Sequence, residues 1–128
     1  MSDTPDGTLA LASAAAEAIR GLNHATRHPA GLDQPAVAYD ILGSLALTAS
    51  RLPQLLGQIT RWLDQALAAG RLGHDLGEDP AHAAGAAAVF LGDAAASAAA
   101  LAGNLDAAQQ QLASVNGNPA ASRRKDNS

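Results

Sequence analysis

The chain has 128 residues, a formal net charge of −4 and only 2% aromatic residues. This length fits one domain with short tails, and the acidic balance disfavours binding to phosphate backbones or anionic lipid, which requires clustered Lys and Arg. The absence of cysteine excludes disulfides, thiolate metal sites and cysteine nucleophiles. Alanine fills 33 positions and β-branched residues are sparse, so the composition predicts an all-α fold with a thin core of Leu and Ala.

The N-terminal region predicts a polar tail followed by one amphipathic helix. Residues 1–8 lack the basic and apolar regions of a signal peptide, so we expect them to be disordered and the protein to be cytoplasmic. A helix is predicted over residues 9–28, because apolar residues recur there at alternating spacings of four and three. Pro29 and Gly31 end the pattern. Its apolar positions are Leu11, Ala15, Ala18, Ile19, Leu22 and Ala25.

A second, longer helix is predicted over residues 34–69. Asp33 is a candidate N-cap, and Gly70 suits the left-handed position after the last turn. Pro53 predicts a kink because it lacks an N–H group and crowds the preceding turn, with a looped break at Pro53 as the alternative. Apolar residues fill both seam positions of a heptad: Leu42, Leu45, Ala49, Leu52, Leu56, Ile59, Leu63 and Ala66. A third column beside this seam contains Ile41, Thr48, Leu55 and Trp62.

A third helix is predicted over residues 80–115, with Asp79 as its N-cap and Pro80 at its first position. Its predicted seam is Ala87, Leu91, Ala94, Ala98, Leu101, Leu105, Ala108, Leu112 and Val115. The stretch 81–102 is long enough to span a bilayer, but Asp93 near its middle favours a soluble helix.

These elements predict one helical domain over residues 9–116. The two long helices have similar lengths and a short connection, which favours an antiparallel hairpin. The shorter N-terminal helix would complete a three-helix bundle, which could also dimerise. Residues 117–128 carry Arg123, Arg124 and Lys125 without an apolar pattern, and we expect a disordered basic tail.

Two groups of polar residues have types suited to metal binding. His74, Asp75, Glu78 and His82 lie within the connection between the long helices, together with the expected cap Asp79. We interpret this group as a solvated turn, with a metal site as the alternative. His24 and His28 are four residues apart on the first helix, but the sequence offers no evident third ligand.

No motif of a catalytic centre is present. The sequence contains no nucleophile elbow, phosphate-binding glycine loop or dinucleotide fingerprint, so we expect neither enzymatic activity nor a cofactor. Trp62 and Phe90 are the large anchors at the edges of their apolar stripes, and each could cover the core or contact a partner. Leu47 and Leu67 lie off the main stripe and favour an additional packing surface.

Four short segments carry a resemblance to a known group of proteins. They are Ala38-Tyr39-Asp40-Ile41-Leu42-Gly43, Arg51-Leu52-Pro53-Gln54, Trp62-Leu63 and Leu105-Asp106-Ala107-Ala108-Gln109. Over about residues 37–115 the chain resembles small Ala- and Leu-rich helical proteins of high-GC actinobacteria, a group without an established activity. In size and hairpin shape it is also similar to secreted WXG-type proteins, although residues 70–79 contain no Trp-x-Gly.

The leading functional hypothesis is a non-enzymatic helical interaction module that pairs with itself, as a homodimer, or with another helical protein. The main alternative is a metal-binding sensor or metal-dependent activity at the turn from His74 to His82. Two lesser alternatives are an accessory DNA-binding protein that uses the basic tail and an exported WXG-like hairpin.

Overall fold

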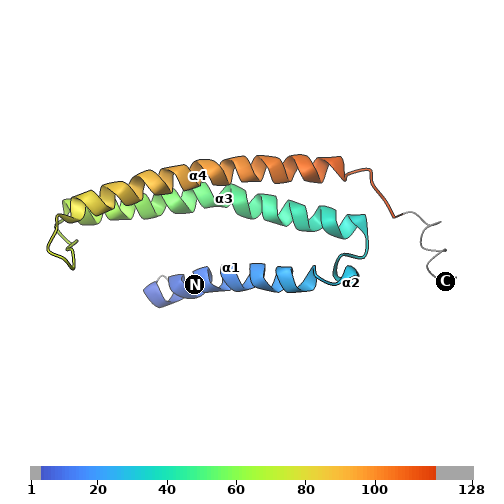
Figure 1. Cartoon of the computed structure of the whole chain (residues 1–128), viewed down its shortest axis with the longest axis horizontal. Coiled ribbons are helices and arrows are strands. Elements are labelled where there is room, and N and C mark those ends of the chain that lie inside the picture. Colours follow the sequence, from blue (N-terminus) through green and yellow to red (C-terminus); the bar gives the residue numbers. More distant parts are fainter. Residues whose placement is uncertain (1–3, 118–128) are drawn as a thin grey trace. The chain divides into compact units, whose positions relative to one another are not determined.

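The computed structural model describes residues 4–117 of the chain. Within this range it contains four helices and no strand: α1 (Pro5–Ala25), α2 (Pro29–Leu32), α3 (Pro35–Ala68) and α4 (Pro80–Gln111) (Figure 1). The predicted all-α class is therefore confirmed. The chain divides into two compact units, of which one, Tyr39–Ser114, contains most of α3 and all of α4. The other unit contains α1, α2 and the first residues of α3.

Proline marks the start of each helix in the described range. Its fixed φ angle suits the first helical position, where the missing N–H group has no partner to lose. Asp79 strengthens the start of α4, because its Oδ1 accepts a hydrogen bond from the Ala81 N–H at 2.9 Å. The sequence prediction that Asp79 caps a helix is confirmed. The four initiating prolines are Pro5, Pro29, Pro35 and Pro80.

Helix α1 begins earlier and ends earlier than the predicted range of residues 9–28. Thr4 is its N-cap and accepts a hydrogen bond from the Gly7 N–H at 3.2 Å, so residues 5–8, expected to be disordered, are helical. Thr26 follows the last turn, and its hydroxyl donates to the Leu22 carbonyl at 2.7 Å. The short helix α2 was not predicted. Residues 1–3 and the basic tail from 118 lie outside the described residues.

Helix α3 matches its predicted range to within one residue at each end. It is continuous through Pro53, so the alternative of a looped break at this position is wrong. Gly70 adopts a φ of 71°, and the Arg71 N–H donates to the Ala66 carbonyl at 2.9 Å. This six-to-one hydrogen bond is the glycine-terminated ending that the sequence indicated. Helix α4 ends at Gln111, before the predicted residue 115.

Helices α3 and α4 lie side by side and run in opposite directions, joined by residues 69–79 (Figure 1). Their contact is made largely by alanine methyl groups. In the described part of the chain, the buried hydrophobic residues are Ala46, Ala49, Ala66 and Ala98. Small side chains let two helix backbones approach closely, but each one removes little apolar surface from water.

The seam between α3 and α4 is wider than predicted on α3 and rotated on α4. On α3 every predicted seam residue except Ile59 is buried or half-buried. A further column beside them is buried or half-buried too, and it contains Ala46, Pro53, Thr60 and Leu67. On α4 the buried and half-buried residues are Pro80, Ala84, Ala87, Ala88, Leu91, Ala95, Ala98, Ala102, Leu105 and Gln109, and Leu112 directly after the helix is half-buried as well. The predicted seam members that the structure instead exposes are Ile59, Ala94, Leu101, Ala108 and Val115.

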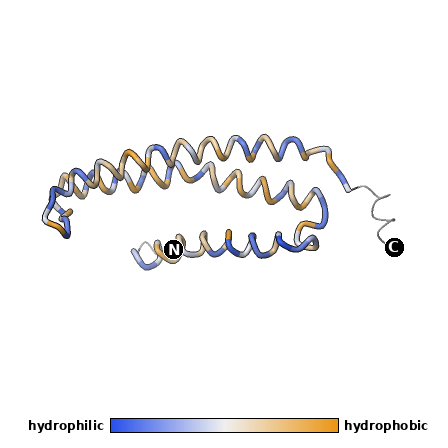
Figure 2. Tube along the Cα trace, viewed as in Figure 1, coloured by the Kyte–Doolittle hydropathy of each residue, from blue (hydrophilic) through white to orange (hydrophobic). Residues whose placement is uncertain are grey.

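The rotation has a physical cause in the composition of α4. Apolar residues recur around most of this helix, so periodicity alone does not select the side that faces α3 (Figure 2). Alanines allow the closest backbone approach, and Leu101 of the predicted seam is exposed while Leu91 and Leu105 stay half-buried. The pair therefore buries its small residues and exposes several of its large ones.

Candidate interaction surface

The α3–α4 pair has two faces, and one of them carries a shallow groove between the helices. On α3 the groove is lined by Gly43, Ala46, Leu47 and Ser50, and on α4 by Ala102, Gly103, Asp106 and Gln109. These residues lie on one flank of the seam in each helix. The opposite flanks, which include Leu52 on α3 and Leu101 on α4, must therefore share the other face of the pair.

That other face carries the large apolar residues that the seam excludes. The exposed fractions are 49% for Leu55, 42% for Ile59, 53% for Trp62, 72% for Phe90 and 48% for Leu101. Together with their apolar neighbours on the same flanks, these residues form a surface that we name the apolar strip. Its members are Leu45, Thr48, Leu52, Leu55, Ile59 and Trp62 of α3, and Phe90, Ala94, Leu101 and Ala108 of α4.

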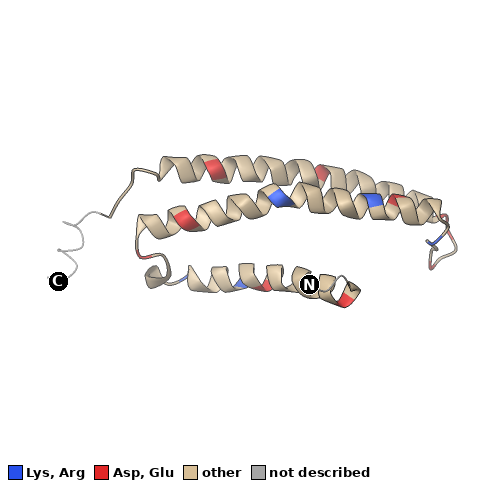
Figure 3. Ribbon diagram, turned by 180° about the vertical axis from the view of Figure 1, so that it is seen from behind, with Lys and Arg blue, Asp and Glu red and all other residues tan. Residues whose placement is uncertain are grey.

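The apolar strip contains no ionisable side chain. The charged residues of the two helices are few and lie at other positions, as Figure 3 shows for the ribbon as a whole. Trp62 also has a cationic neighbour, because the Arg71 guanidinium lies 5.8 Å from the centroid of its ring. Arg71 is held there by its backbone hydrogen bond to Ala66. This distance is within the range of a cation–π interaction, so one exposed cation lies next to the apolar strip at Trp62.

The four interaction candidates from the sequence lie in three different places. Trp62 and Phe90 are exposed and belong to the apolar strip. Leu47 is exposed but lines the groove on the opposite face. Leu67 is half-buried and belongs to the seam column of Ala46, so it does not form part of an exposed surface. The structure therefore brings together two of the four and separates the others from them.

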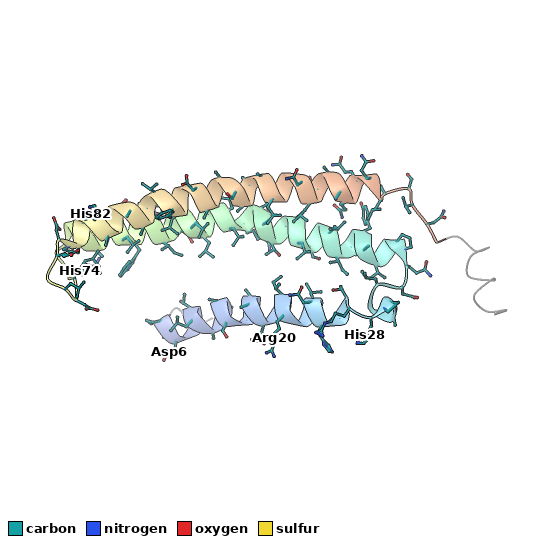
Figure 4. All side chains as sticks on the ribbon, viewed as in Figure 1. Asp6, Arg20, His28, His74 and His82 are labelled. Atoms are coloured by element: carbon teal, nitrogen blue, oxygen red, sulfur yellow. The ribbon has the colours of Figure 1, made fainter. Side chains whose placement is uncertain are left out.

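The polar turn between α3 and α4 is accounted for by its own hydrogen bonds. His74 Nδ1 accepts from the Leu76 N–H at 3.1 Å, which assigns the ring proton to Nε2, and Nε2 lies 3.9 Å from a carboxylate oxygen of Glu78. Asp79 is occupied as the α4 cap, while Asp75 is exposed. Figure 4 places His74 and His82 at this end of the pair.

No metal centre is assembled from these residues. Between residues 4 and 117, no three His, Cys, Asp or Glu side chains converge closely enough to hold an ion. His24 and His28 approach edge to face, with ring centroids 6.0 Å apart, and both are exposed. The hypothesis of a metal site at the turn therefore gains no geometric support from the described residues.

Helix α4 also has the length and composition of a membrane span. Its most apolar window has a mean hydropathy of 1.5, and 6% of that window is buried in the structure. Much of this hydropathy comes from alanine, which contributes little to membrane insertion, and Asp93 lies within the helix. Core helices of soluble proteins and signal sequences can have the same length and composition, so this property does not by itself assign α4 to a membrane.

Sequence reasoning missed one contact that joins the two helices. Gln109 Nε2 donates a hydrogen bond to the Tyr39 carbonyl at 3.2 Å, and Gly43 lies directly against the same amide nitrogen. The sequence signal for this contact was a glycine on α3 opposite a glutamine on α4. That signal could be recognised only once it was known which faces of the two helices meet.

Comparisons with family models, curated proteins and solved structures found no match to this chain.

Proposed function

We propose that the protein is a non-enzymatic helical interaction module that uses the apolar strip to pack against a helix of another polypeptide chain. The observation that supports this proposal is the exposure of Trp62 and Phe90 on one face of the pair, because large aromatic residues are enriched in protein interfaces. Monomeric soluble proteins rarely leave a contiguous apolar patch of this kind without a partner. The partner is either a second copy or another helical protein.

Part of the apolar strip can be covered by the chain itself. Helix α1 is amphipathic, with Leu11, Ile19 and Leu22 on its apolar side, and packing against α3 and α4 would complete a three-helix bundle. This arrangement is part of the proposal. It is compatible with a cytoplasmic location, because the bundle would place the apolar side of α1 against protein rather than lipid.

Alanine substitutions at Trp62 and Phe90 test the proposed function. Each should weaken the association of the full-length chain, because loss of an aromatic anchor costs about 2 kcal/mol or more in many interfaces. The readouts are the absolute mass in solution and the amount of each protein that co-purifies with the chain. Circular dichroism should show unchanged helicity, since both side chains are more than half exposed.

Val89→Ala is the matched control. Val89 is the residue next to Phe90 on α4, is 64% exposed and does not belong to the apolar strip. It should therefore leave association unchanged. If Trp62→Ala and Phe90→Ala are folded and also leave the mass and every co-purifying protein unchanged, the proposed function is wrong.

A further inference from the structure

We infer that Asn116 is a site of spontaneous covalent modification, at which the side-chain amide is lost and an aspartyl or isoaspartyl residue replaces asparagine. The inference is independent of the proposed function and of how the two compact units are placed. It rests on the residue that follows Asn116, on the backbone conformation at this point and on the exposure of the residue to water.

Asn116 lies outside the helices and turns of the described chain. Helix α4 ends at Gln111, a turn over residues 112–114 follows, and residues 115–117 have no regular structure. Asn116 is also exposed to water. No helical hydrogen bond therefore prevents the backbone from turning so that the side-chain carbonyl of Asn116 approaches the next backbone nitrogen.

The nitrogen that follows Asn116 belongs to Gly117, and glycine obstructs an attack by its nitrogen least of all residues. It has no Cβ atom to shield the nitrogen and can adopt a wide range of φ and ψ angles. Packing also favours glycine here, because a Cβ atom on residue 117 would lie 2.6 Å from Oε1 of Gln34. Gln34 and Gly117 belong to the same compact unit. The contact with Gln34 therefore accommodates the residue that makes Asn116 most reactive.

The reaction needs only water as a co-reactant. The Gly117 backbone nitrogen loses its proton to hydroxide and attacks Cγ of Asn116 with the electron pair that remains. The new bond joins this nitrogen to Cγ, the bond from Cγ to the side-chain nitrogen breaks, and that nitrogen takes up protons from water and leaves as ammonia. The product is a five-membered cyclic imide.

Water then opens the imide ring at one of its two carbonyl carbons. Addition at Cγ breaks the bond from Cγ to the Gly117 nitrogen and gives aspartate. Addition at the backbone carbonyl carbon breaks the original peptide bond and gives isoaspartate, in which the main chain runs through Cγ. Both products carry a carboxylate where asparagine had an amide.

Two neighbouring asparagines lack the features that make Asn116 reactive. Asn104 precedes Leu105 within α4, where the helical backbone and the leucine side chain keep the following nitrogen away from the asparagine amide. Asn118 precedes Pro119, whose nitrogen carries no hydrogen to lose. Both residues therefore serve as references for Asn116 in the same molecule.

Conversion of Asn116 would change the charge and the backbone at the same point. The new carboxylate adds one negative charge to the formal net charge of −4. In the isoaspartyl form, one additional main-chain carbon separates residue 116 from Gly117, so the contact between Gly117 and Gln34 must rearrange. We therefore expect a more acidic form of the chain, with an altered contact just before α3, to accumulate with time.

The test is incubation of the full-length chain at mildly alkaline pH, followed by peptide mass spectrometry with fragmentation. The peptide segment that contains Asn116 should gain about 1 Da, because an amino group is replaced by a hydroxyl group. Asn104 and Asn118 should stay intact while most of Asn116 is converted. The rate should rise with pH, since the Gly117 nitrogen attacks only after it has lost its proton. An Asn116 that stays intact, or reacts no faster than Asn104, overturns the inference.

Asn116→Gln is the matched control variant. Glutamine keeps an exposed amide at this position, but its closure on the Gly117 nitrogen would require a six-membered ring, which forms far more slowly. Anion-exchange chromatography of the incubated wild-type chain should show a later-eluting acidic species, which Asn116→Gln should lose and which Asn116→Asp should match from the start. If Asn116→Gln forms that species as fast as the wild-type chain, the modified residue is a different one and the inference is wrong. Circular dichroism should be the same for all three proteins, because residue 116 lies outside the helices.

Discussion

Gly43 and Gln109 connect α3 to α4 through a hydrogen bond and a close approach. The Gln109 amide reaches the Tyr39 carbonyl because Gly43 has no Cβ atom in its path. Gly57, on the same helix, has no heavy atom within 4 Å of the place where its Cβ would lie. The two glycines therefore differ in environment while sharing the same low helix propensity.

We predict that alanine substitution at these two positions gives different stabilities. Gly57→Ala should raise the free energy of unfolding by about 1 kcal/mol, because alanine is the better helix former. Gly43→Ala should gain clearly less or become destabilising, because the new methyl group displaces the Gln109 amide and about 1 kcal/mol of hydrogen bonding is lost. Urea unfolding followed by circular dichroism measures both changes.

Gln109→Ala supplies the control for this comparison. In its background the methyl group at position 43 meets no amide, so Gly43→Ala should then stabilise nearly as much as Gly57→Ala. A Gly43→Ala effect that is the same with and without Gln109 would show that the two residues are not coupled.

The ends of the helices were the features that single residues in the sequence predicted best. Asp79 with Pro80, and Gly70 after the last turn of α3, give signals that depend on a few neighbouring atoms. The same logic applies to Thr4 with Pro5, which the acidic composition of residues 1–8 obscured. The hydrogen bonds at a helix end can be inferred from sequence when one capping residue makes them.

At the scale of a single element, α3 contains a proline that its helix tolerates. Pro53 cannot donate to the Ala49 carbonyl, and its ring lies half-buried in the seam. The helix continues because residues on both sides of Pro53 pack against α4. Tertiary contacts therefore outweigh the local preference for a break.

We predict that Pro53→Ala stabilises the protein by about 1–3 kcal/mol. The substitution restores a backbone hydrogen bond and removes the steric conflict with the preceding turn, at the cost of the packing made by the ring. The measurement is the urea midpoint together with the thermal midpoint. Gln54→Ala, at the exposed neighbouring position, should change stability by less than about 0.5 kcal/mol. A destabilised Pro53→Ala would mean that ring packing in the seam dominates.

The location and length of α3 and α4 were predictable, but the direction in which each faces its neighbour was not. On α3 periodicity identified the seam correctly except at Ile59, but it missed the additional column that contains Ala46. On α4 the uniform apolar composition left the rotation undetermined, and Leu101 was assigned to the contact although it is exposed. The candidate surface therefore contains residues that the sequence suggested as core.

At the scale of the whole molecule, association of two copies through the apolar strip would link folding to concentration. If the apolar strips of two copies stabilise each other, dilution removes part of that stabilisation by mass action. We predict that a tenfold dilution lowers the thermal midpoint of the wild-type chain by a few degrees. Phe90→Ala should show a weaker dependence over the same range. A midpoint that is independent of concentration for both proteins would contradict the linkage.

The alanine seam has a consequence for how the protein tolerates mutation. Ala49, Ala66 and Ala98 are buried, so a larger side chain at these positions must displace its neighbours, and glycine and serine are the best-tolerated replacements. A saturation library should therefore show intolerance at these small, seemingly featureless positions. The conspicuous leucines and aromatics on the outside should vary freely in assays of folding and become restricted only in assays of association.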